Sequence, residues 1–213
     1  AASTVQISIA TVPDPGLDGT ATVCASGAAI DLYTELEGTP DIGGSWSGPS
    51  AAVDGSFDPA TMLPGIYTYL IAVPPPCTSV SSTVTINTIA PPDPGFSGAL
   101  ALCITSPASS LFAQLGGSPD VGGTWTDPNG DTHSAFMNPA VDLSGLYTYT
   151  VAGTAPCPSA STQIDVNVVE NPDPGASSGA TLCASDTPID LFAQLGGTPD
   201  AGGSWSGPSA VVG

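Results

Sequence analysis

Few residues of this chain could carry out chemistry, and the single histidine is the first of them. His133 lies in the segment NGDTHSAF, next to Ser134. A Ser-His-Asp site needs an imidazole that is buried and oriented by a carboxylate. A lone histidine in a polar turn is more often a solvent-exposed loop residue. We therefore predict no catalytic residues and no enzyme activity.

Carboxylate and amide side chains in the same region have the spacing of cation ligands. Asp127, Asn129 and Asp131 form the D-x-N-x-D pattern that opens a calcium loop. An EF-hand loop then has Gly at position 6 and Glu at position 12, where this sequence has Thr132 and Asn138. The segment DPNG is also typical of a turn, and we favour the turn over a calcium site.

A second set of aspartates lies in the tetrapeptide PDPG, which occurs three times. These aspartates are Asp14, Asp93 and Asp173. They are candidate calcium ligands between domains, or acceptors of hydrogen bonds in a turn that the prolines set. We favour the turn, so calcium is the one candidate cofactor and no metal site is assigned.

Longer stretches recur as well, and they define an internal repeat of about 80 residues. The phrase GGTPDAGGSWSGPSA at 196–210 also occurs as EGTPDIGGSWSGPSA at 37–51 and as GGSPDVGGTWTDPNG at 116–130. A catalytic motif needs to occur once, whereas every folding unit needs its own core. We therefore interpret Gly-Gly-x-Trp as a structural motif, in which two glycines allow a tight turn before a core tryptophan.

The repeat divides the chain into four parts. Residues 13–91 and 92–171 are predicted to be whole repeats. Residues 1–12 match the last strand of a preceding repeat, and residues 172–213 match the first half of a further one. We therefore expect this chain to be a piece of a longer array, and the alternative is that another chain completes the two partial repeats.

The alternation of side chains within a repeat predicts strands rather than helices. In GLYTYTVAG, Tyr147 and Tyr149 fall on one face, and STQIDVNVV alternates in the same way. The segment SSLFAQL at 109–115 is also predicted to be a strand. Short strands separated by turn signals predict an all-β fold of antiparallel β-sandwiches. The expected core anchors are Trp46, Trp125, Trp205, Tyr67 and Tyr147.

The cysteines recur at matching places in the repeats. The order Cys24, Trp46, Cys77 resembles an immunoglobulin-like layout, so the predicted fold is a tandem array of immunoglobulin-like repeats. Two cysteines per repeat in a protein outside the cytosol predict the pairs Cys24–Cys77 and Cys103–Cys157. Cys183 is then expected to have its partner beyond residue 213.

The charge of the chain has one sign. It has 19 acidic residues and no Lys or Arg, which gives a formal net charge of −19. Binding to nucleic acid depends on Lys and Arg, so we exclude nucleic acid as a partner. No apolar run approaches the roughly 20 residues that span a bilayer, and we expect no membrane insertion. The expected partners are neighbouring repeats or copies of the chain, and the abundant Ser and Thr residues are candidates for O-glycans.

Two stretches of the second repeat resemble a known family. LCITSPASSLFAQLGGSPDVGGTWTDPNG and GLYTYTVAGTAPCPSASTQIDVNVV are similar to repeats of large secreted surface proteins of Bacteroidota, which are associated with gliding motility and type IX secretion. The resemblance implies an extracellular or cell-surface location and no catalytic residues. It favours a structural fibre, filament or stalk, and the alternative is an adhesin repeat that binds glycans or surfaces.

Overall fold

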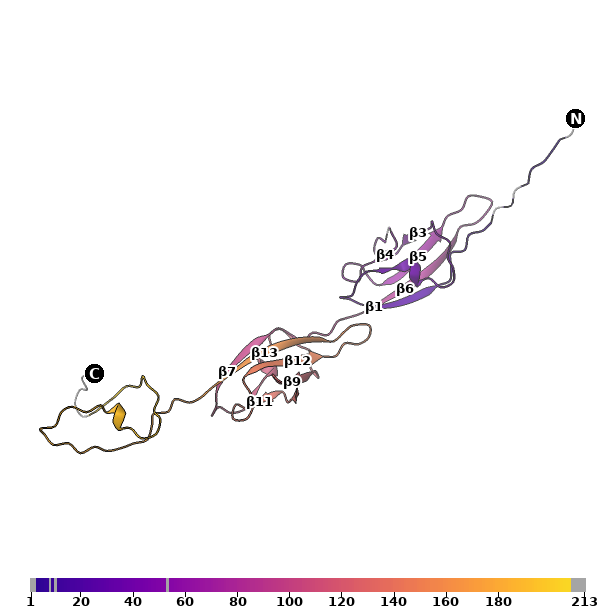
Figure 1. Cartoon of the computed structure of the whole chain (residues 1–213). Coiled ribbons are helices and arrows are strands. Elements are labelled where there is room, and N and C mark those ends of the chain that lie inside the picture. The colour runs from indigo at the N-terminus through magenta and orange to yellow at the C-terminus, as the bar shows by residue number, and fades with distance from the viewer. Residues whose placement is uncertain (1–2, 8, 10, 53, 208–213) are drawn as a thin grey trace.

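The computed structural model describes residues 3–7, 9, 11–52 and 54–207. Two β-sandwiches follow one another along an extended molecule, and residues 172–207 continue the line beyond them (Figure 1). In the described residues the only helical elements are 3-10 helices of three or four residues. The prediction of an all-β fold is therefore confirmed. No helix in this part of the chain is long and apolar enough to cross a membrane.

The first sandwich has a larger and a smaller sheet. The larger sheet has the strand order β1-β6-β5-β3, and the smaller one pairs β2 with β4. These strands are β1 (Gly19–Cys24), β2 (Ile30–Asp31), β3 (Ser45–Ser47), β4 (Ser56–Phe57), β5 (Gly65–Ile71) and β6 (Val80–Ile89).

The second sandwich repeats this arrangement. Its larger sheet has the order β10-β9-β12-β13-β7, and its smaller sheet pairs β11 with β8. The strands are β7 (Gly98–Cys103), β8 (Ser109–Ser110), β9 (Thr124–Thr126), β10 (Thr132–His133), β11 (Phe136–Met137), β12 (Gly145–Val151) and β13 (Ala160–Val169).

In each larger sheet, the strand that comes first along the chain lies parallel to the strand that comes last along the chain. The other strand pairs are antiparallel. β1 lies parallel to β6, with Cys24 opposite Ile89, and β7 lies parallel to β13, with Cys103 opposite Val169. The chain therefore leaves each sandwich at the end opposite to the one where it entered. This direction of travel produces the linear array in Figure 1.

Each sandwich has its own hydrophobic core. Tyr67 and Tyr147 are fully buried in the two cores. Trp125 is buried, and Trp46 is half-buried against the first core. Trp205 differs from its counterparts, because 45% of its surface is exposed. The expectation of a buried Trp205 is wrong for the described chain. Residues 172–207 contain no strand that could pack over this ring.

The segment at 109–115 is not the continuous strand that its sequence predicts. It is the short strand β8, followed by a 3-10 helix, η2 (Phe112–Gln114). The same turn occurs as η1 (Leu32–Glu35) and η3 (Phe192–Gln194). In η1 the carboxylate of Asp31 accepts a hydrogen bond from the backbone N–H of Tyr33 at 2.9 Å. The turn directs one leucine, Leu111 in the second repeat, fully into the core.

Two further segments flank the sandwiches. Residues 3–7, 9 and 11–16 belong to no strand. Residues 172–207 contain η3 and one isolated bridge, between Ala176 and Gly196. The assignments of 1–12 and 172–213 to parts of further repeats stay predictions, and residues 1–2, 8, 10 and 208–213 lie outside the described chain.

Candidate functional site at the repeat junction

The disulfide of this chain joins two successive repeats. Cys24, the last residue of β1, is bonded to Cys157 in the loop between β12 and β13, with their Cα atoms 4.8 Å apart. The predicted pairs Cys24–Cys77 and Cys103–Cys157 within repeats are therefore wrong. Cys77, Cys103 and Cys183 are free thiols.

Strand direction explains why the cysteines within a repeat do not meet. Cys24 lies opposite Ile89, at the end of β6, whereas Cys77 precedes the start of β6 at Val80. β6 has ten residues, and a strand rises about 3.3 Å per residue. The two cysteines thus lie at opposite ends of a strand roughly 30 Å long, and a disulfide needs Cα atoms within about 7 Å.

The long loop between β12 and β13 supplies the second cysteine of the junction. This loop extends from the second sandwich toward the end of β1 (Figure 1). Cys24 and Cys157 are each 5% exposed, although neither belongs to a hydrophobic core. The Sγ atom of Cys157 lies 3.3 Å from the carbonyl oxygen of Ile89. The loop therefore packs on the ends of both β1 and β6.

The PDPG segment between the repeats is held by a reciprocal pair of hydrogen bonds. The backbone N–H of Asp93 donates to Oδ2 of Asp120 at 2.9 Å, and the N–H of Asp120 donates to the carbonyl oxygen of Asp93 at 2.8 Å. Oδ1 of Asp93 accepts from the N–H of Gly95 at 2.8 Å. The same bonds join Asp14 to Asp41 and Asp173 to Asp200. We call each of these an aspartate clamp.

The clamps assign a structural task to the predicted calcium ligands at the junctions. Asp14, Asp93 and Asp173 all lie in the turns, and their Oδ1 atoms accept backbone N–H groups. Among the described residues, no three His, Cys, Asp or Glu side chains gather in the manner of a metal site. Calcium binding at the junctions stays the alternative to the favoured turn.

The DPNG segment is a turn in the structure. Oδ1 of Asp127 accepts hydrogen bonds from the N–H groups of Asn129 and Asp131, both at 2.9 Å. Gly130 has φ at +88° and donates its N–H to the carbonyl oxygen of Asp127. This carboxylate therefore organises the turn between β9 and β10.

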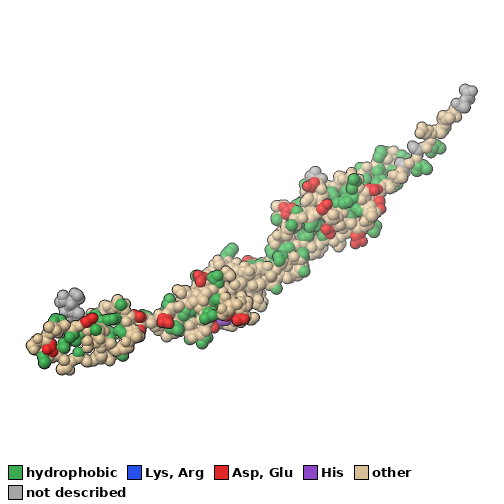
Figure 2. Space-filling model, viewed as in Figure 1, with side chains coloured by type: hydrophobic (Ala, Val, Ile, Leu, Met, Phe, Trp, Pro, Cys, Tyr) green, Lys and Arg blue, Asp and Glu red, His purple; other side chains and the backbone are tan. Residues whose placement is uncertain are grey.

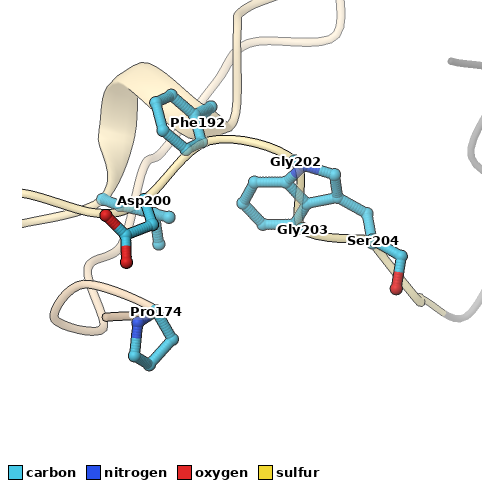
Figure 3. Close-up of a pocket in the computed structure, with 8 residues that line it drawn as sticks. Pro174, Phe192, Asp200, Gly202, Gly203 and Ser204 are labelled. Carbon is cyan, nitrogen blue, oxygen red and sulfur yellow. The ribbon is translucent and has the colours of Figure 1, made fainter. Parts of the chain in front are cut away.

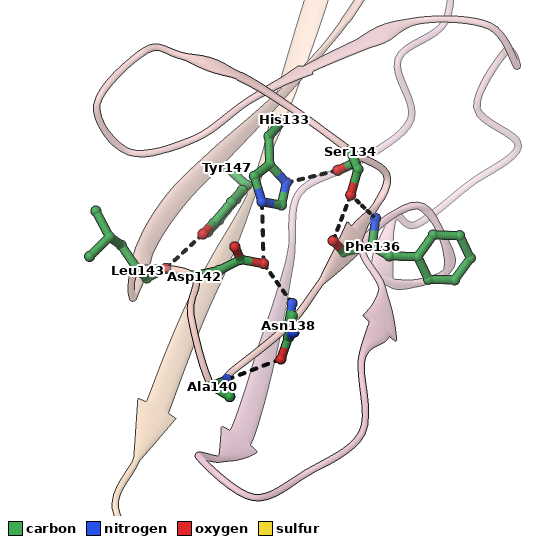
Figure 4. A network of polar contacts seen from close by, with 8 residues as sticks. All are labelled: His133, Ser134, Phe136, Asn138, Ala140, Asp142, Leu143 and Tyr147. Carbon is green, nitrogen blue, oxygen red and sulfur yellow. Dashed lines mark hydrogen bonds and ion pairs between the residues drawn. The ribbon is translucent and has the colours of Figure 1, made fainter.

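His133 takes part in a polar network (Figure 4). Its Nε2 lies 3.3 Å from Oδ2 of Asp142, and its Nδ1 lies 2.8 Å from the backbone oxygen of Ser134. The Ser134 hydroxyl is directed elsewhere, because it donates to the backbone oxygen of Phe136 at 2.8 Å. The imidazole therefore does not face this hydroxyl as a triad would require, and the network ties β10 to the loop before β12.

Tyr147 lies beside this network and has a perturbed acidity. Its hydroxyl donates to the backbone oxygen of Leu143 at 2.8 Å. Burial raises the pKa of the Tyr147 phenol above 10.0, and the negative charges of Asp142 and Asp127 raise this pKa further. Its hydroxyl is thus held by the backbone of the loop before β12.

A cavity of about 220 Å³ lies within residues 172–207, and its lining includes Phe192 and Trp205. Figure 3 shows this cavity from close by. In the second repeat, the equivalent space holds the ring of Tyr149, whose centroid lies 5.5 Å from that of Phe112 and 4.9 Å from that of Trp125. The cavity thus corresponds to a core position of the sandwich. We assign it no ligand.

Comparisons with known proteins identify neighbours by structure alone. No protein-family model matches the chain, and no curated protein matches it. Similar solved structures include the immunoglobulin domains 1–4 of Sidekick-1, at 13% identity and a TM-score of 0.28 over 75% of this chain and 52% of that one.

Two other similar structures are a titin fragment of three immunoglobulin domains and an insect immune protein. The titin fragment I67–I69 is 15% identical, with a TM-score of 0.32 over 79% of this chain and 72% of that one. The insect immune protein hemolin is 11% identical, with a TM-score of 0.39 over 74% of this chain and 46% of that one. The chain thus spans about half the length of the Sidekick-1 and hemolin structures.

The sheet topology defines the class of this protein. It consists of tandem all-β repeats, each an immunoglobulin-like two-layered sandwich with its own core. Besides the polypeptide backbone, the Cys24–Cys157 disulfide links one repeat covalently to the next.

Proposed function

We propose that this chain is a structural segment of an extracellular fibre, filament or stalk. The observation that carries the proposal is the position of the disulfide, between repeats instead of within one. A bond at that position contributes little to the core of either sandwich. It does limit bending and separation of the two sandwiches, which is what a rod under load requires.

The junction has a second source of stiffness. The PDPG segment brings two prolines to each connection, and proline-rich connectors are semi-rigid. The aspartate clamp fixes this segment to the following repeat through Asp93 and Asp120. The connection and the disulfide therefore restrain the junction at two places.

An extracellular location agrees with the chemistry of the chain. Disulfides persist in oxidising compartments. Acidic side chains are spread over both sandwiches, with no cationic Lys or Arg among them (Figure 2). The similarity of the repeats to secreted surface proteins of Bacteroidota extends the proposal to a bacterial cell surface and to neighbouring repeats or copies as the partners.

Electron microscopy of the purified chain, with X-ray scattering in solution, tests the proposed rod. We expect a straight particle whose length is set by sandwiches placed end to end, and we expect reduction of the disulfide to broaden the distribution of bend angles. Particles that are bent at random before reduction would contradict a load-bearing function.

One observation favours an adhesin as the second candidate. Ile42 and Val121 occupy equivalent tips of the PD-x-GG loops, and they are 85% and 83% exposed. Exposed apolar side chains at matching loop tips are suited to contact with a surface. Binding to immobilised glycans or to cell surfaces that is lost in an Ile42→Ser, Val121→Ser variant would favour the adhesin over the rod.

A further inference from the structure

The two free cysteines of the whole repeats occupy positions that are bonded in the neighbouring repeat. We call Cys24, Cys103 and Cys183 the first cysteines, and Cys77 and Cys157 the second cysteines. The structure joins a first cysteine, Cys24, to the second cysteine of the following repeat. We propose that Cys103 is the covalent docking site for the second cysteine of a further repeat of this kind, placed after the second sandwich.

Cys103 matches Cys24 in its backbone surroundings. Each ends the first strand of its larger sheet, opposite the last residue of the final strand. The N–H of Ala25 donates to the oxygen of Ile89 at 2.8 Å, and the N–H of Ile104 donates to the oxygen of Val169 at 2.9 Å. The second sandwich therefore ends in the same arrangement of backbone that receives Cys157 at the end of the first.

The two strand ends differ in what covers them. Cys24 is 5% exposed beneath the loop that carries Cys157. Cys103 is exposed, and the adjacent Ile104 and Val169 are 39% and 45% exposed. Cys103 is thus an exposed thiol with apolar neighbours, at a position where its counterpart Cys24 is covered by a loop. This difference indicates that the same kind of loop, the one before the last strand of a following sandwich, covers Cys103.

Cys77, the second cysteine of the first repeat, follows the same pattern as Cys157. It lies in the loop between β5 and β6, as Cys157 lies between β12 and β13. This loop projects from the first sandwich on the side away from the second (Figure 1). A repeat thus presents a first cysteine forward and a second cysteine backward, and successive repeats form a continuous chain of disulfides along the rod.

The bond requires an oxidant. The thiols of Cys103 and of the incoming cysteine each lose a proton, one S–S bond forms, and two electrons are released. A low-molecular-weight disulfide accepts these electrons and is cleaved to two thiols by thiol–disulfide exchange. No other co-reactant is needed.

A chain with one completed repeat tests the proposal. Gly213 follows Trp205 by eight residues, as Asp54 follows Trp46. A copy of residues 55–91 appended after Gly213 therefore continues the repeat that begins at 172, and it adds one second cysteine. After refolding with oxidised and reduced glutathione, cleavage at aspartate without reduction and mass spectrometry should recover this cysteine bonded to Cys103. Cys183 should be recovered as an alkylated thiol.

Matched variants separate Cys103 from Cys183, which is the other exposed first cysteine. Cys103→Ser should leave the appended cysteine alkylated, whereas Cys183→Ser should leave the bond unchanged. A second fusion, with residues 134–171 appended instead, guards against poor folding of one added sequence. A bond to Cys183, or a free appended cysteine in both fusions, would overturn the proposal. This measurement reports connectivity, so it can fail even if the unextended chain is a rod.

Discussion

In both sandwiches the second glycine of the Gly-Gly-x-Trp motif provides space for a tyrosine ring. A Cβ atom on Gly123 would lie 2.6 Å from the ring of Tyr149 and 2.6 Å from the oxygen of Thr150. The N–H of Gly123 donates to the Tyr149 hydroxyl at 2.9 Å, and this hydroxyl donates to the oxygen of Asp120 at 2.7 Å. Close approach of the backbone to a core tyrosine therefore explains this glycine.

We expect Gly123→Ala to destabilise the second sandwich by about 1–3 kcal/mol, because the added methyl group overpacks the site. Chemical denaturation measures the change. Gly203→Ala is the matched control, since Gly203 occupies the same motif position and nothing lies within 4 Å of its added Cβ. Equal losses of stability in the two variants would contradict the steric explanation.

Tyr147 is predicted to titrate later than an ordinary tyrosine. Burial is the largest cause of its raised pKa, and the charges of Asp142 and Asp127 are smaller causes. Because the folded state favours the neutral phenol, this group contributes stability below the unfolded pKa of about 10. That contribution is lost as the pH rises through the raised folded pKa.

Ultraviolet absorbance of the phenolates measures this titration. Tyr147→Phe should remove one late-titrating group, and Asp142→Asn should lower the pKa of Tyr147, because it removes a negative charge nearby. An unchanged titration curve in both variants would show that the Tyr147 phenol is not perturbed.

At the scale of elements, the aspartate clamp joins the PDPG segment to the loop before the tryptophan strand. Asp120→Ala removes the acceptor of the Asp93 N–H. We expect a loss of about 0.5–1.5 kcal/mol in the stability of the second sandwich, the usual net contribution of such a bond. Asp165→Ala is the control, because it removes an equal charge from the outer face of β13. Thermal unfolding of both variants should show a lower Tm for Asp120→Ala only.

The disulfide acts between elements of different sandwiches. The two hydrophobic cores lie on either side of it, so its removal should loosen the junction without unfolding either core. The double variant Cys24→Ser, Cys157→Ser should keep the unfolding temperatures of the sandwiches within a few degrees. X-ray scattering should show a wider range of particle dimensions, while Cys103→Ser should match the unmodified chain. Unfolding of a whole sandwich in the double variant would contradict separate cores.

Across the molecule, the charged side chains on the surface are acidic. The formal net charge is −19, and acidic side chains are visible on both sandwiches (Figure 2). Repulsion between such molecules acts over about 10 Å at 0.1 M salt. This repulsion therefore opposes contact between molecules that lie side by side. Molecules that meet end to end repel each other less.

We expect acid or calcium to promote lateral association of the chain. Acid protonates carboxylates, and calcium ions neutralise them at neutral pH. Light scattering should show net repulsion between molecules at neutral pH and low salt, and attraction after either treatment. Sodium chloride at matched ionic strength distinguishes calcium binding from screening. If light scattering responds to neither treatment, charge does not govern the association of the chain.

The period, the strand composition and many strand positions could be predicted from the residues alone. Alternation in GLYTYTV predicts which faces of β12 are buried, and Tyr147 and Tyr149 are in fact 0% and 1% exposed. These features are local, since the alternation of side chains along a strand depends only on neighbouring residues. The turn at DPNG was predictable for the same reason.

Other features could not be predicted in this way, because they depend on contacts between residues that are distant along the chain. The cysteine pairing follows from the parallel direction of β1 and β6 and from a loop of the next sandwich, which lies 133 residues from Cys24. The burial of Leu111 favours a 3-10 turn over a longer strand. A single buried side chain there takes the place of alternating buried and exposed positions. The exposure of Trp205 likewise depends on which strand covers it, and a motif of four residues contains no such information.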